Sequence, residues 1–108
     1  MNNPVASLEV IGIQPGGAHF TIAAHIGQPY RDEDGAWACA VEMKPLFDKL
    51  ADIRGIDSFH ATWLACSLIL KLLEHFRAGG GRLYNEDGSD FPLDAYLRGL
   101  DSNRPEPV

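Results

Sequence analysis

Histidine is the side chain best suited to metal binding or proton transfer at neutral pH, and this chain has four. His60 and His75 fall on one face of a predicted helix, but about 22 Å apart at the helical rise per residue. His19 and His25 share one face of a predicted strand, about 20 Å apart at the strand rise. Neither pair can hold one metal ion. The remaining alternative is a metal site whose ligands come from several elements. The sequence therefore predicts no metal and no cofactor.

The candidate nucleophiles of the chain are Ser67 and the two cysteines, each of which would need a neighbouring base. Ser67 and Lys71 stand one helical turn apart, but Glu74 beside them makes a solvated polar face the simpler interpretation. Cys39 and Cys66 fall on apolar faces, where a thiol packs as a small hydrophobic group and a thiolate is disfavoured. No convergent reactive set emerges. The sequence predicts no catalytic residues and a protein that is not an enzyme.

Two acidic clusters and one glycine run are the remaining candidate binding motifs. The glycines at 79–81 follow a predicted helix, where the negative end of the helix dipole repels phosphate, so they predict a helix stop. The second acidic cluster, at residues 86–90, resembles a calcium loop only in composition, because it lacks the alternating ligands and the distal glutamate of such a loop. Both acidic clusters are therefore open to two interpretations. They are interpreted either as solvated turns or as contact loops for a basic protein partner. Their members are Asp32, Glu33, Asp34, Glu86, Asp87 and Asp90.

The element that dominates the sequence is a long helix predicted from Asp57 to Ala78 and closed by the glycine run. Asp57 and Ser58 can cap its first turn, and no proline interrupts it. At the helical rise it would be roughly 33 Å long. The stripe that faces the sheet contains Ala61, Ala65, Leu68, Ile69, Leu72, Leu73 and Phe76, and the polar wedge contains His60, Ser67, Lys71, Glu74 and His75.

A second apolar group lies beside that stripe and widens the apolar arc of the helix. With this group the arc reaches roughly 200°, where about 100° is enough for a helix that rests on a sheet. Either the C-terminal segment or a second copy of the chain must then cover the extra surface. We name this group the helix flank; it consists of Phe59, Trp63, Cys66 and Leu70. The helix flank is the candidate interface, and a homodimer is the expected assembly.

Alternating apolar and polar residues predict strands on both sides of the helix. They indicate one α+β domain over 1–100: an antiparallel sheet of four or five strands arranged as a meander, with the long helix on one face. A short helix follows at about 91–98, and a flexible tail at 101–108. Ala38 and Ala40 would lie on the reverse of the third strand, open to water or to a partner. The strands are expected at Leu8–Ile13, His19–Ile26, Trp37–Met43, about Ala51–Arg54 and Arg82–Tyr84.

Composition and charge argue against several functions. The net charge is −6 and the nine basic residues are scattered, so phosphate-dominated binding of nucleic acid is not expected. The longest run of low polarity, from Trp63 to Leu70, is far shorter than the ~20 residues that span a bilayer, so no membrane association is expected. The N-terminus lacks the basic and apolar regions of a secretory signal, which favours a cytoplasmic location.

The residues around the long helix resemble a family of short bacterial proteins that form a domain of unknown function. Gly55-Ile56-Asp57-Ser58 resembles its G-[IV]-D-S helix start, and Gly80-Gly81-Arg82-Leu83 resembles its closing GG-x-L strand. The resemblance covers mainly residues 54–91, about a third of the chain, and implies a sheet with one long helix. It implies no activity and no catalytic residues.

The expected function is a non-enzymatic, cytoplasmic interaction module that self-associates through the helix flank. The alternative is a small acidic inhibitor, such as an immunity protein for a bacterial toxin, whose acidic loops steer it toward a basic partner protein. A small-ligand binder or an enzyme would need a polar pocket between helix and sheet, where the sequence places mostly leucine, isoleucine and phenylalanine.

Overall fold

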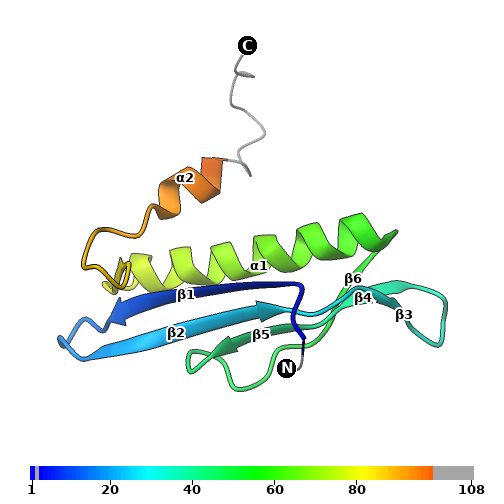
Figure 1. Cartoon of the computed structure of the whole chain (residues 1–108), viewed down its shortest axis with the longest axis horizontal. Coiled ribbons are helices and arrows are strands. Elements are labelled where there is room, and N and C mark those ends of the chain that lie inside the picture. The colour runs from blue at the N-terminus through cyan, green and yellow to red at the C-terminus, as the bar shows by residue number, and fades with distance from the viewer. Residues whose placement is uncertain (2, 99–108) are drawn as a thin grey trace, which may run out of the picture.

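The fold combines antiparallel β-sheets with two helices. The computed structural model describes Met1 and residues 3–98, so the predicted tail at 101–108 lies outside the described residues. The helices are α1 (Ser58–Ala78) and α2 (Leu93–Arg98). The α+β class, the four-stranded antiparallel sheet and both helices are confirmed (Figure 1). The strands are β1 (Ala6–Ile13), β2 (His19–Ile26), β3 (Tyr30–Arg31), β4 (Trp37–Cys39), β5 (Val41–Lys44), β6 (Ile53–Gly55) and β7 (Arg82–Tyr84).

The larger sheet has the strand order β5-β2-β1-β7. Its centre is the β1–β2 hairpin, in which all eight residues of each strand pair, and alternation along β2 turns Ile22, Ala24 and Ile26 toward the core. In the connecting loop the Gln14 N–H donates to the Ala18 carbonyl at 2.8 Å, and Gly17 supplies a positive φ of 99°. β7 then returns to the outer side of β1. The strand order therefore differs from the expected simple meander.

The second sheet, with the order β3-β4-β6, is a feature that the sequence did not predict. The segment expected as one strand, Trp37–Met43, divides at Ala40 into β4 in this sheet and β5 in the larger one. The Ala40 carbonyl accepts the Gly27 N–H at 2.9 Å where the two sheets separate. As a result Ala38 and Cys39, neighbours in the chain, are both buried, at 2% and 0% exposure. A continuous strand would turn one of them to the reverse face, so the expectation of an open Ala38 is wrong.

α1 lies across one face of both sheets and begins and ends where its caps predict (Figure 1). The Asp57 carboxylate accepts the His60 N–H at 2.7 Å and so satisfies a free donor of the first turn. At the other end the N–H groups of Gly79 and Gly80 bond to carbonyls of the last turn, and Gly80 has a φ of 102°. The core beneath α1 contains Val10, Ile22, Ala24, Ile26, Cys39, Val41, Met43, Ala61, Ala65, Ile69, Leu73, Leu83, Phe91 and Leu93.

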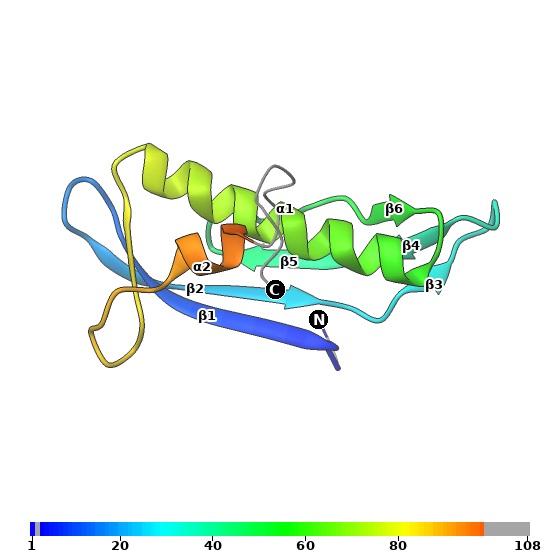
Figure 2. The same ribbon diagram turned by 90° about the horizontal axis from the view of Figure 1, so that it is seen from above.

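α2 is short and lies on the β1 side of α1 (Figure 2). It begins at Leu93, slightly later than predicted, and this leucine is 1% exposed. Phe91 and Tyr96 stack with 5.2 Å between ring centroids, and the Arg77 guanidinium donates to the Asp94 carboxylate at 2.8 Å. These contacts hold α2 near the last turns of α1. Among the described residues, the first half of α1 therefore has no helical neighbour.

Candidate interaction surface

The helix flank forms one row along α1 that is exposed in its first half and packs beside the core at Leu70. Phe59 is 79% exposed, Trp63 is 45% exposed, and Cys66 is exposed as well. Leu70 is half-buried, because it lies in the part of the row next to α2. Ile56, directly before the N-cap Asp57, is 85% exposed as well. Within the described part of the chain, no element covers the first half of this row.

Small residues hold the N-terminal half of α1 close to the second sheet. Ala61 and Ala65 are both 0% exposed, in the half of the helix that contacts β4 and β6. At Gly55 the two backbones come so near that an added Cβ would lie 2.5 Å from the Ala61 nitrogen. The Ile56 N–H donates to the His60 Nδ1 at 3.0 Å, which fixes the entry to the helix. With small residues on its inner face, the helix carries its large aromatic side chains on the outer side.

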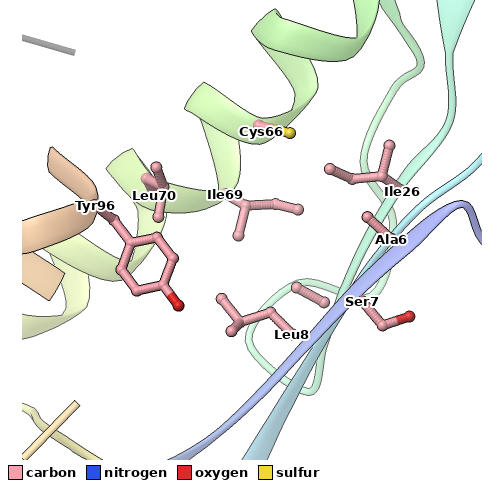
Figure 3. Close-up of a pocket in the computed structure, with 9 residues that line it drawn as sticks. Ala6, Ser7, Leu8, Ile26, Cys66, Ile69, Leu70 and Tyr96 are labelled. Atoms are coloured by element: carbon pink, nitrogen blue, oxygen red, sulfur yellow. The ribbon is translucent and has the colours of Figure 1, made fainter. Parts of the chain in front are cut away.

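A cavity of about 240 Å³ opens between the second half of the helix flank and the β1 side of the larger sheet (Figure 3). Leu8 from β1, Leu70 from α1 and Tyr96 from α2 border it from three elements. Its lining is almost wholly apolar, and its volume is below the roughly 300–1,000 Å³ of typical ligand sites. The cavity therefore suits an apolar side chain better than a metabolite. The other lining residues are Ala6, Ser7, Ala24, Ile26, Cys66 and Ile69.

Both cysteines lie in surroundings that disfavour the thiolate. Cys39 is 0% exposed, its Sγ donates to the Gly27 carbonyl at 3.2 Å, and burial raises the pKa of its thiol. Cys66 reaches the surface, yet desolvation by its surroundings raises the pKa of its thiol too. A raised pKa lowers the thiolate fraction at neutral pH. Neither sulfur is activated as a nucleophile.

The two acidic clusters occupy hairpin loops of the same design at opposite ends of the molecule (Figure 1). In each loop the N–H of the first residue bonds to the carbonyl four positions on, at 2.9 Å for Asp32 and 2.8 Å for Asn85. The Asp32 carboxylate also accepts the N–H groups of Asp34 and Ala36, at 2.9 and 3.0 Å, and pairs with Arg54. Asp32 is therefore a structural residue of its own turn.

Asp87 has the same role in the second acidic loop. It accepts the Ser89 N–H at 2.9 Å, and hydrogen bonds from the Ser89 side chain and backbone lower the pKa of Asp87. The other four predicted carboxylates are exposed, and they are divided between the two distant loops rather than gathered into one surface. Binding of a basic partner through these carboxylates stays a prediction, and each loop would have to bind the partner by itself. These four are Glu33, Asp34, Glu86 and Asp90.

The remaining candidate chemistry is dispersed over the fold. The His25 Nδ1 lies 2.8 Å from the Ser7 Oγ, on the sheet face away from α1. Ser67 is only 6% exposed while Lys71 is exposed, so the expectation of a solvated Ser67 is wrong. Within residues 1 and 3–98, no three His, Cys, Asp or Glu side chains are placed to hold a metal ion. No helix in that same part of the chain is long and apolar enough to cross a membrane.

Comparisons of the chain with known protein families, with curated proteins and with solved structures found no match. The resemblance to short bacterial proteins thus stays a prediction, although its motif residues have structural roles. Gly55 allows the close approach of α1, Asp57 caps the helix and Gly80 ends it. Leu83 belongs to the core at 7% exposure. The motif therefore describes how the helix is held and identifies no site.

Two residues of this surface were missed by the sequence analysis. Ile56 stands directly before the N-cap, where an apolar side chain usually packs on the fourth residue of the helix. Here that fourth residue is the small Ala61, which gives Ile56 little to pack on, so this signal was available. Tyr96 belongs to the apolar pattern that predicts the short C-terminal helix. That pattern does not indicate on which side of α1 the short helix packs. The cavity that it borders could not be predicted for the same reason.

Proposed function

We propose that the protein is a self-associating interaction module of the cytoplasm, a homodimer with no chemistry of its own. The observation that carries this proposal is the pair of exposed aromatic side chains Phe59 and Trp63, one turn apart on α1, with the exposed Ile56 just before the helix. Isolated exposed apolar residues are normal on protein surfaces, whereas contiguous rows mark interaction sites. Tryptophan is also among the residue types that contribute most to binding energy at interfaces.

The exposed area in this row is large enough to matter for association. Applying the exposed fractions of Phe59 and Trp63 to side chains of about 150–250 Å² gives about 270 Å² per copy. At about 25 cal/mol per Å², complete burial in two copies contributes about 13 kcal/mol. Association costs roughly 4–15 kcal/mol in lost freedom. The two aromatic residues therefore support a dimer of moderate affinity, and further contacts are needed for a tight one.

A second copy of the chain is the partner that the charge of this surface favours. The protein carries a net charge of −6, so contact between most parts of two copies brings like charges together. The helix flank contains no charged residue and escapes this repulsion. A two-fold interface also uses the same patch on both subunits, so one apolar row is sufficient.

Sedimentation velocity over about 1–500 μM protein tests the proposal, because micromolar affinity corresponds to about 8 kcal/mol. The unmodified protein is expected to change from monomer to dimer in this range. The double variant Phe59→Ser, Trp63→Ser should stay monomeric, because both anchors of the row are gone. The matched control, Lys71→Ser, His75→Ser, makes two serine substitutions at exposed positions elsewhere on α1 and should dimerise normally.

Two outcomes would count against the proposal. An unmodified protein that remains a monomer throughout the concentration range would remove self-association altogether. A dimer that is weakened equally by both double variants would show that the contact does not depend on the helix flank. Circular dichroism of all three proteins checks that the substitutions leave the helix folded.

A further inference from the structure

The larger sheet has an open edge beside the helix flank. β7 pairs with β1 only at Ile11–Ile13, so residues 6–10 of β1 have a neighbouring strand on the β2 side alone among the described residues. An open edge presents unpaired N–H and C=O groups that bond readily to another extended chain. The same stretch of β1 lines the cavity beneath Leu70 and Tyr96. The open edge and the apolar cavity therefore form one continuous surface.

The hairpin identifies which backbone groups point outward at this edge. Because the Gln14 N–H donates to the Ala18 carbonyl, the even-numbered residues of β1 bond toward β2. Bonding direction alternates from residue to residue in an antiparallel ladder. The N–H and C=O groups of Ser7 and Glu9 consequently point away from β2, toward the open side.

We propose that two copies of the chain join by antiparallel pairing of their β1 edges, with Leu8 opposite Leu8 of the second copy. This inference rests on the proposed self-association and specifies how the two copies meet. Pairing about Leu8 uses the whole free segment, and Ser7 of each copy exchanges two backbone hydrogen bonds with Glu9 of the other. The four-stranded sheets of the two copies become one continuous sheet.

Two other two-fold registers are less favourable. Pairing about Glu9 sets two carboxylates opposite each other and directs Ser7 to Ile11, which already pairs with β7. Pairing about Ser7 brings Glu9 to Val5, whose N–H is already bonded to the Ile26 carbonyl at 2.8 Å. Only the register centred on Leu8 leaves every existing backbone bond in place.

The side chains support the Leu8 register on both faces of the sheet. On the helix side, Leu8 points into the cavity, so the two leucines meet beside Tyr96 and Leu70 of each copy (Figure 3). On the other face, the Ser7 Oγ lies 2.8 Å from the His25 Nδ1. Glu9 of the second copy stands across from this hydroxyl, as a cross-strand neighbour that can accept a hydrogen bond from it. Each carboxylate thus meets a hydroxyl–imidazole pair and not another acid.

A second copy fits this edge better than an unrelated peptide. The free segment is bounded by β7 at one end and by the bonded Val5 at the other, and in the Leu8 register residues 6–10 of one copy pair with residues 10–6 of the other. The chain before β1 is held away from the edge, because the Met1 ammonium pairs with Glu42 of β5 at 3.2 Å. Cys66 belongs to the helix flank and also lines the cavity, so edge pairing and covering of the flank occur on the same side.

Engineered cysteines test the register in the full-length protein carrying Cys66→Ser. Leu8→Cys places two thiols in a non-hydrogen-bonded pair about 4.5 Å apart between Cα atoms, within the range of a disulfide. Mild oxidation is expected to cross-link this variant. Ser7→Cys alone should stay uncross-linked, whereas a mixture of Ser7→Cys and Glu9→Cys proteins should form the mixed dimer, because these positions lie opposite each other.

A second pair of variants tests the edge without any thiol. Glu9→Pro removes an outward N–H but no bond to β2, so it should abolish the dimer in sedimentation and leave the monomer folded. Glu9→Gln keeps that N–H and should dimerise. In the unmodified protein, the amides of Ser7 and Glu9 should exchange with solvent about tenfold more slowly at dimer concentrations than on dilution.

The outcomes separate this inference from the proposed function. A dimer that survives Glu9→Pro and whose Leu8→Cys form does not cross-link would overturn edge pairing and leave self-association standing. A monomer at every concentration would overturn both. Slow exchange of these amides that appears only after addition of a short peptide of alternating valine and threonine would exclude the second copy as the occupant.

Discussion

Replacing Gly55 with alanine is expected to destabilise the protein strongly, because the backbone of α1 leaves no room for a side chain. The added Cβ would lie 2.5 Å from the Ala61 nitrogen and 2.8 Å from the Ala61 Cα. Ordinary contacts begin at 3.4 Å, so β6 and α1 must separate locally by about 0.9 Å. Neither element is free to move: Gly55 pairs with Trp37 of β4, and Asp57 caps the helix just beyond it.

The expected cost follows from the nature of this contact. Overpacking a close-packed site costs about 1–3 kcal/mol, and a clash with backbone atoms belongs at the upper end, about 3 kcal/mol. For a domain of this size, each kcal/mol lowers Tm by about 4–8 °C, so a cost of about 3 kcal/mol should lower the Tm of Gly55→Ala by about 12–24 °C. Urea and thermal unfolding followed by circular dichroism measure both quantities.

Gly16→Ala is the matched control for this substitution. No atom lies within 4 Å of the position that its Cβ would take, so its stability should change by less than about 1 kcal/mol. A Gly55→Ala protein that unfolds at the same urea concentration as the unmodified protein would refute the close approach of β6 and α1. It would also remove the reason why Phe59 and Trp63 occupy the outer side of the helix.

Three further predictions follow from the packing and the charges. Iodoacetamide should modify Cys66 more slowly as the protein concentration rises, while the buried Cys39 stays protected throughout. A modification rate of Cys66 that is independent of protein concentration would contradict coverage of the helix flank. Leu73→Ala, at a core position with 0% exposure, should cost about 2–5 kcal/mol in urea unfolding, and a loss below about 1 kcal/mol would mean that α1 does not rest on this core. A hydrogen bond from the Met1 ammonium lowers the pKa of Glu42, so the stabilisation from this pair is present above the ordinary carboxyl pKa and is lost as pH falls through the lowered one. The Tm difference between the unmodified protein and Glu42→Gln should therefore shrink on acidification, and a constant difference would contradict the pairing.

Features decided by local chemistry could be predicted from the sequence. The ends of α1 were confirmed because a side-chain cap at Asp57 and a left-handed glycine at Gly80 act within one helical turn. The β1–β2 hairpin was likewise set by alternation and by its turn. The division of the next strand at Ala40 was not predictable, because residues on each side of the bend keep alternating. The small Ala38 and Cys39 fit either face, so their burial depends on which sheet each half joins.

The surface was predictable to the extent that it lies on one helix. Periodicity alone placed Phe59, Trp63, Cys66 and Leu70 in one row. The cover over the end of that row could not be predicted, because the position of α2 depends on β7, which pairs with β1 across a long separation in the sequence. The open edge of β1 has the same origin. It exists because β7 pairs with only three residues of β1. The sequence of neither strand alone indicates how many residues will pair.

Self-association is the claim on which the proposed function and the edge pairing both depend, and sedimentation equilibrium of the unmodified protein tests it most directly. The weight-average mass is expected to rise from the 11.8 kDa of one chain toward twice that value across the micromolar range. It should level off there, because a two-fold interface closes on itself and leaves no surface for a third copy. A mass that stays at that of one chain at the highest concentration would contradict the account.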